Sequence, residues 1–139
     1  MVKTLRSKTL SASLQESPHV TFAWVADPDN LPQWYRSFFR SVQKENGASL
    51  MVQSPRGPAA LRVIRDDRAF LLDLVLNLDG VELFVAIRVL ANGDGSEIVL
   101  TLIQPQGLPD DAFQEHTRWA GSALAELKNI QSLPRGKNS

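Results

Sequence analysis

His116 is the side chain in this sequence best suited to acid–base chemistry. Histidine changes charge near neutral pH, so it can serve as a general acid or base. It falls in a segment with helical periodicity, on the flank of the apolar face, where it can reach a space beneath the helix. The alternative is a partly exposed helix residue that bonds a neighbour such as Asp73, or water. His19 lies beside a predicted helix start, which favours a surface or capping position.

Aromatic side chains gather in a short segment that contains Trp34, Tyr35, Phe38 and Phe39. They provide a large apolar area, and Tyr and Trp add a polar atom, which suits recognition of a flat or apolar ligand. We favour Tyr35 and Trp119 as lining residues, because each can place one donor in an apolar pocket. The alternative is ordinary packing, since Trp34 and Phe38 have the i, i+4 spacing of one helix face.

Arginines on the predicted early strands and their loops are a further candidate group: Arg40, Arg56, Arg62 and Arg65. A guanidinium that entered a cavity would bind a carboxylate through two parallel hydrogen bonds. Arg62, however, alternates with Leu61 and Val63, which favours a solvent-facing position. We expect Arg88 and Glu97 to form an exposed pair across the last predicted hairpin.

The composition excludes several kinds of site. The 139 residues include no cysteine and two widely separated histidines, so we expect no metal site, no disulfide and no cysteine nucleophile. A Gly-rich phosphate loop and a Gly-x-Ser-x-Gly elbow are both missing, and no cofactor is expected. Fifteen basic residues balance fifteen acidic ones, which argues against a nucleic-acid partner. Apolar runs fall short of the roughly 18 residues of a membrane span, and we expect a cytoplasmic protein.

A long helix predicted over residues 109–133 must position His116 and Trp119. Pro109 suits a first helical turn, and the acidic pair Asp110 and Asp111 places negative charge where the helix dipole favours it. The apolar residues repeat with the spacing of one buried face, at Phe113, Ala120, Leu124 and Leu127.

Shorter elements precede this helix. A first strand is predicted over 4–12, followed by two short helices over 18–25 and 31–38. Six further strands, separated by turn signals such as Asn46-Gly47, are predicted over 40–44, 50–53, 60–64, 69–76, 81–90 and 97–103. The connections are too short for a parallel return, so neighbouring strands must be antiparallel.

Alternation along the strands produces one continuously apolar face. In the strand 81–90, one set of residues is uniformly apolar, whereas the other includes Glu82 and Arg88. That face needs a cover, and the C-terminal helix is the only element long enough. We therefore predict an α+β fold: a seven-stranded curved antiparallel sheet, two short helices after the first strand, and a long C-terminal helix across the concave face. We expect a single domain over 1–139, with an ordered core over about 3–133 and a polar tail over 134–139.

Several motifs point to a known family. Residues 22–34 read Phe-Ala-Trp-Val-Ala-Asp-Pro-Asp-Asn-Leu-Pro-Gln-Trp, and residues 92–97 read Asn-Gly-Asp-Gly-Ser-Glu before alternating aliphatic residues. The last helix carries Phe113 and Trp119 and ends with 124–128. In these motifs and in element order, nearly the whole chain resembles the START-like, helix-grip superfamily, also called SRPBCC. Within it, the chain resembles the short bacterial polyketide cyclase/dehydrase-like proteins.

The resemblance implies a deep, largely apolar cavity between the sheet and the C-terminal helix. Superfamily members use such a cavity for lipids, sterols, polyketides, plant hormones and aromatic metabolites. Relatives often carry Leu-Asp-His where this chain has Leu72-Asp73-Leu74, so an inward-facing histidine is missing, which argues against catalysis. The residues expected to line the cavity are Trp34, Tyr35, Phe38, Met51, Leu74, His116 and Trp119.

These observations lead to three functional hypotheses. The first is a binding protein for a small apolar or aromatic molecule, such as a lipid or polyketide, with His116 and Tyr35 as polar fixing points. The second is a cyclase or dehydratase that uses His116 as general acid or base, assisted by a tyrosine hydroxyl. The third is a protein-interaction module, which includes a homodimer, formed through an apolar patch on the outer sheet face: Leu71, Val75, Phe84, Val99 and Ile103.

Overall fold

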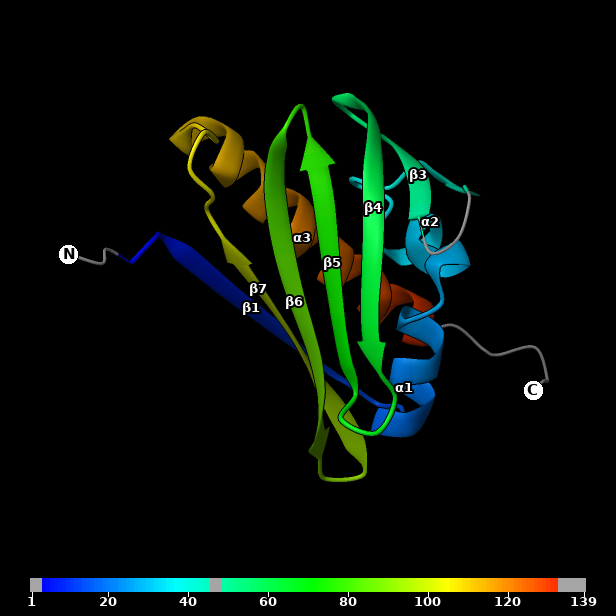
Figure 1. Ribbon diagram of the computed structural model, residues 1–139. Helices are drawn as coiled ribbons and strands as arrows, with labels where there is room; N and C mark the ends of the chain where they lie inside the picture. Colours follow the sequence, from blue (N-terminus) through cyan, green and yellow to red (C-terminus); the bar gives the residue numbers. More distant parts are fainter. Residues whose placement is uncertain (1–3, 46–48, 133–139) are drawn as a thin grey trace.

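The chain forms one curved antiparallel sheet packed against a long helix (Figure 1). This computed structural model describes residues 4–45 and 49–132, with side chains described as far as residue 130. The helices are α1 (Pro18–Val25), the 3-10 helix η1 (Pro28–Asn30), α2 (Leu31–Trp34) and α3 (Asp110–Ser132). The strands are β1 (Ser7–Leu14), β2 (Ser41–Lys44), β3 (Ser49–Ser54), β4 (Gly57–Asp66), β5 (Leu71–Leu78), β6 (Val81–Asn92) and β7 (Gly95–Ile103).

The strand order is β1-β7-β6-β5-β4-β3-β2, and every neighbouring pair is antiparallel. Strands β2 to β7 follow one another as a meander, and β1 pairs with β7, from Ser7 opposite Ile103 to Leu14 opposite Ser96. In Figure 1, α3 crosses behind the strands on a diagonal. The predicted sheet with a long C-terminal helix across one face is therefore confirmed.

Period-two alternation supplies the buried layer between sheet and helix. Leu74 of β5 pairs with Val85 of β6, which in turn pairs with Leu102 of β7. All three side chains are at most 1% exposed. Full burial of one such side chain stabilises the fold by about 1.5–3 kcal/mol. On the helix, the residues that belong to the same hydrophobic core as the strand residues are Phe113, Ala120, Ala123, Leu124 and Leu127.

Capping residues define the helix starts. The Ser17 hydroxyl accepts a hydrogen bond from the Val20 N–H at 3.3 Å, and Pro18 is the first residue of α1. The carbonyl of Pro109 accepts a hydrogen bond from the Phe113 N–H at 2.9 Å. Pro109 therefore precedes α3 instead of lying in its first turn, which corrects the predicted start by one residue.

The second short helix ends earlier than predicted. We expected a helix over 31–38, but α2 ends at Trp34, because Tyr35 leaves the helical region at φ −103° and ψ 39°. The N–H groups of Phe38 and Phe39 both donate to the carbonyl of Tyr35, at 3.2 and 2.8 Å. Residues 35–39 therefore form a turn, which directs several aromatic side chains inward.

Some predicted strand ends also shift. The strand predicted over 69–76 begins at Leu71, because the Asp66 carboxylate caps the N–H of Ala69 at 3.2 Å and Phe70 adopts a left-handed φ of 51°. The strand predicted over 4–12 spans Ser7–Leu14, and the one predicted over 60–64 spans Gly57–Asp66. The predicted Asn46-Gly47 turn and tail over 134–139 lie outside the described residues.

Candidate functional site

An aromatic cluster lies where the turn after α2 meets α3. Phe38 is at its centre, with ring centroids 4.9 Å from Phe39, 5.4 Å from His116 and 5.5 Å from Trp119. The rings of His116 and Trp119 meet edge to face at 4.9 Å. Tyr35 extends the series toward Trp34, and the aromatic cluster is defined here as Trp34, Tyr35, Phe38, Phe39, His116 and Trp119.

Two polar contacts fasten the turn to the helix. The Ser37 hydroxyl donates to the backbone carbonyl of Trp119 at 2.7 Å. The guanidinium of Arg36 lies 3.0 Å from the carboxylate of Glu126. The hydrogen bond is partly buried and the ion pair is exposed, so the hydrogen bond contributes more to stability.

His116 is buried, with an exposed fraction of 3%, and its Nε2 has no hydrogen-bond partner among the described residues. Desolvation lowers the pKa of the imidazole to about 4, with a smaller contribution from the positive charge of Arg56 that outweighs the opposing effect of Glu115. The expected partner Asp73 is instead bonded to Arg88 at 3.0 Å. The alternative of a partly exposed helix residue with a partner such as Asp73 is therefore wrong, because this part of α3 faces the core.

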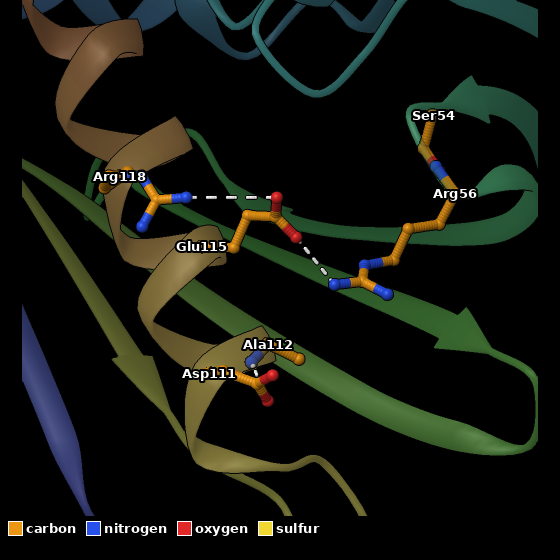
Figure 2. Close-up of polar contacts among 6 residues, drawn as sticks. All are labelled: Ser54, Arg56, Asp111, Ala112, Glu115 and Arg118. Atoms are coloured by element: carbon orange, nitrogen blue, oxygen red, sulfur yellow. Dashed lines mark hydrogen bonds and ion pairs between the residues drawn. The ribbon is translucent and has the colours of Figure 1, made fainter.

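An ion-pair network spans the surface beside His116. Figure 2 shows Arg56 and Arg118 approaching the Glu115 carboxylate from opposite sides, at 2.6 and 3.9 Å. The Ser54 hydroxyl accepts from the Arg56 N–H at 3.1 Å, which shapes the β3–β4 turn that carries the arginine. The network ties this turn to α3.

The arginines expected on a solvated face are all exposed: Arg40, Arg56, Arg62 and Arg65.

Trp34 and Tyr35 contribute the other polar atoms of the cluster. Trp34 is fully buried, and its Nε1 has no hydrogen-bond partner among the described residues. Tyr35 is 4% exposed, and burial raises the pKa of its hydroxyl well above the usual value. The Tyr35 hydroxyl is therefore neutral at physiological pH, and the Trp34 indole is a neutral hydrogen-bond donor.

Two of the expected lining residues come from the sheet, and they face opposite ways. Leu74 is 1% exposed and lies on the concave face, in register with Val63 and Val85. Met51 pairs with the exposed residue Ala60, while its neighbours Leu50 and Val52 are buried. Met51 therefore points to the outer face, and its expected place in the cavity lining is wrong.

Three hollows on the described part of the molecule bear on the site, and none of these three lies between the concave face of the sheet and α3. The first, about 650 Å³, lies between β1 and the first half of α3. The second, about 440 Å³, lies between the turn after α2 and α3. The third, about 190 Å³, lies on the outer face of the sheet. The second reaches the aromatic cluster, since its walls are Trp34, Arg36, Ser37, Ser122 and Glu126.

The expected outer patch is divided by charge. Ile103 is 37% exposed, but the ion pair between Arg88 and Asp73 lies on the same face. The predicted Arg88–Glu97 pair is wrong, because Glu97 accepts a hydrogen bond from Ser13 at 2.6 Å and Arg88 turns toward β5. The other patch residues are half-buried or buried: Leu71, Val75, Phe84 and Val99.

The described residues contain no group of three or more histidine, cysteine or acidic side chains arranged to hold a metal ion. None of the described helices is long and apolar enough to cross a membrane.

The geometry can be compared with known proteins. No protein-family model and no curated protein matches this chain in sequence. Solved structures do match. The XoxI protein of Bacillus cereus superposes with a TM-score of 0.76 at 16% identity, over 92% of this chain and 96% of that one. A START superfamily protein of Mycobacterium smegmatis gives 0.69 at 14% identity, over 94% and 98%.

The di-domain ARO/CYC protein BexL, from the BE-7585A biosynthetic pathway, superposes with a TM-score of 0.70 at 16% identity, over 90% of this chain and 46% of BexL. The protein therefore has the START-like, helix-grip fold. At identities this low, the superpositions establish the fold alone, and the function must be argued from the site.

Proposed function

We propose that the protein binds a small, flat, largely apolar molecule between the concave face of the sheet and α3, beside the aromatic cluster. The supporting observation is the pair of buried polar atoms that lack partners among the described residues, Nε1 of Trp34 and Nε2 of His116. A buried polar atom left unpaired costs about 1–3 kcal/mol. A ligand with a hydroxyl or carbonyl group supplies the missing partner, which favours a polar-edged aromatic or polyketide-like molecule over a plain hydrocarbon.

Entry requires a local opening, because the aromatic side chains are already in contact with one another. The hollow of about 440 Å³ leads to Trp34 from outside, with Arg36 and Glu126 on its walls. Their exposed ion pair contributes roughly 0.2–1 kcal/mol. Separation of the turn 35–39 from α3 breaks this pair and the bond from Ser37 to Trp119, so we place the entry here.

The same residues favour binding without turnover. An imidazole whose pKa is about 4 is a poor proton acceptor at neutral pH, where a general base works best with a pKa near 7. The raised pKa of Tyr35 likewise makes its hydroxyl a poor proton donor. The cyclase or dehydratase alternative needs one of these groups to transfer a proton. The pKa of His116 is too low for a base at neutral pH, and the pKa of Tyr35 is too high for an acid.

Native mass spectrometry of freshly purified protein, followed by an NMR titration, tests the proposal. A co-purifying small molecule would identify the ligand class directly. For the titration, 2-naphthol and naphthalene share a flat apolar skeleton and differ by one hydroxyl. We expect 2-naphthol to bind more tightly and to shift the resonances of Tyr35, Phe38, His116 and Trp119.

A matched pair of variants shows whether the hydroxyl reaches His116. In His116→Leu, the preference for 2-naphthol over naphthalene should fall by about tenfold, as expected for loss of one buried hydrogen bond. In His19→Leu, which alters an exposed histidine, the preference should stay unchanged. If neither compound binds at millimolar concentration, or if shifts appear only on the outer sheet face, the proposed site is wrong.

A further inference from the structure

A groove with positively charged walls separates β1 from α3, away from the aromatic cluster. Its volume is about 650 Å³, within the range of sites that bind small molecules. From the β1 side it is lined by Arg6, Ser7 and Lys8, and from α3 by Phe113, Gln114, Thr117 and Arg118.

Lys8, the cation of β1, occupies a position that elsewhere along the strand belongs to the core. Along β1, Leu10 is half-buried and Ala12 and Leu14 are buried, so the even-numbered positions face α3. Lys8 has the same parity but is exposed, and it pairs with Leu102, whose own side chain is fully buried. Lys8 therefore lies on the concave face of the sheet, at a point where α3 does not cover that face.

The positive charge of this groove is only partly balanced. The guanidinium of Arg6 lies 3.8 Å from the Asp110 carboxylate, and that of Arg118 lies 3.9 Å from the Glu115 carboxylate. The Glu115 carboxylate is held more closely by Arg56, at 2.6 Å, and so neutralises Arg118 weakly. Lys8 has no ion pair within the described part of the chain.

We infer that the groove between β1 and α3 binds a small molecule that carries a phosphate group, through Arg6, Lys8 and Arg118. A phosphate monoester carries a charge of about −1.5 to −2 near pH 7, which matches several cations with few carboxylates. The Thr117 hydroxyl donates to the Phe113 carbonyl at 3.0 Å, which leaves its lone pairs free to accept from a ligand hydroxyl. The exposed amide of Gln114 adds donors and an acceptor at the same wall.

An NMR titration at constant ionic strength tests this site with glycerol 3-phosphate, inorganic phosphate and glycerol. We expect both phosphates to shift the amides of residues 6–8 and 114–118, and glycerol alone to leave them unchanged. Tighter binding of glycerol 3-phosphate assigns the site to phosphate esters, whereas equal affinities assign it to free phosphate. Either result supports a phosphate site.

The variant Lys8→Gln should weaken binding by about tenfold, the effect of one charge-assisted contact. Lys44→Gln, a matched change of an exposed strand lysine on β2, should change it less than about twofold. The inference is overturned if the two variants bind equally, or if shifts spread evenly over surface lysines and arginines. A third result would also overturn it: Lys8→Gln self-associates while its affinity for the phosphates is unchanged. Lys8 would then serve only to block strand pairing at the β1 edge of the sheet.

Discussion

At the scale of single residues, the surroundings of His116 decide its chemistry. A histidine in water titrates near pH 6.5, but burial beside Phe38 and Trp119 lowers the pKa of this one to about 4. Near pH 7 the imidazole is therefore neutral and offers one donor and one acceptor. Such a group suits recognition of a ligand hydroxyl better than repeated proton transfer.

Because Nε2 of His116 is buried without a partner, removal of the imidazole should stabilise the ligand-free protein. We predict that His116→Leu raises the free energy of unfolding by about 1 kcal/mol, the lower end of the cost of an unpaired buried group. Urea denaturation at pH 7 measures this. The exposed control, His19→Leu, should stay within about 0.5 kcal/mol of the wild type. A marked loss of stability in His116→Leu would mean that the imidazole is well satisfied.

At the scale of elements, the turn over residues 35–39 joins the aromatic cluster to the helix. α2 ends after four residues, and the chain then folds back so that Phe38 contacts both His116 and Trp119. Its attachment to α3 depends on few polar contacts, chiefly that between Ser37 and Trp119. The turn is therefore the part of the site that opens at the lowest cost.

Loss of the Ser37 hydroxyl should make this opening more frequent. We predict that Ser37→Ala lowers the local opening free energy by about 1 kcal/mol, the usual contribution of one hydrogen bond. Hydrogen exchange of the Phe38 and Phe39 amides, whose N–H groups bond within the turn, should then be about fivefold faster. Ser49→Ala, which alters an exposed serine on β3 away from the turn, is the control and should leave these rates unchanged.

The β5–β6 hairpin depends on a two-residue turn in which Asp79 and Gly80 both have positive φ, 53° and 84°. The side-chain Oδ1 of Asn77 accepts a hydrogen bond from the Gly80 N–H at 2.9 Å. We predict that Gly80→Ala lowers the free energy of unfolding by about 1 kcal/mol, because an L-residue is strained at this φ.

The matched control for this change is Gly121→Ala. Gly121 is helical, and an added Cβ would meet nothing within 4 Å, so the change should raise stability by up to about 1 kcal/mol. Thermal unfolding of both variants checks the pair. Effects of the same sign would contradict the backbone argument.

Local periodicity predicted those parts of the site that depend on neighbours in sequence. The alternation of β5 places Leu74 on the inner face correctly, since strand side chains alternate strictly. It could not place Met51, because Leu50-Met51-Val52 is apolar on both faces and pairing with β4 decides the orientation.

Contacts between residues far apart in the chain left no local signal. Arg56 and Glu115 are 59 residues apart, and Ser37 and Trp119 are 82 apart. These pairs arise only when the sheet brings its hairpins and turns beside α3. The single residues of the aromatic cluster were therefore predictable from type, whereas the contacts that position them were not.

At the scale of the whole molecule, the titration of His116 links global stability to pH. Its pKa is about 4 when folded and 6.5 in the unfolded reference, so between these values the unfolded chain binds more protons. The free energy of unfolding should therefore rise with pH across this window and level off, for this group, above it. The full change is on the order of 3 kcal/mol.

Urea denaturation at pH 4.5 and pH 7 measures this dependence, and His116→Leu isolates the contribution of the imidazole. We expect the difference in unfolding free energy between the two pH values to be larger in the wild type than in the variant. The same dependence in both proteins would show that other groups govern the acid sensitivity.

The pairing of β1 with β7 has a consequence for how quickly the chain reaches its native state. Thr9 meets Thr101 across this pair, 92 residues away in sequence. Closing a loop of that length costs roughly 4 kcal/mol in chain entropy, and this cost precedes the stabilising contacts between the two strands. The meander from β2 to β7 needs only short loops, so it can assemble first, and capture of β1 becomes the slow step. Until that step, β7 is an open edge, and association of unfinished chains competes with the final closure.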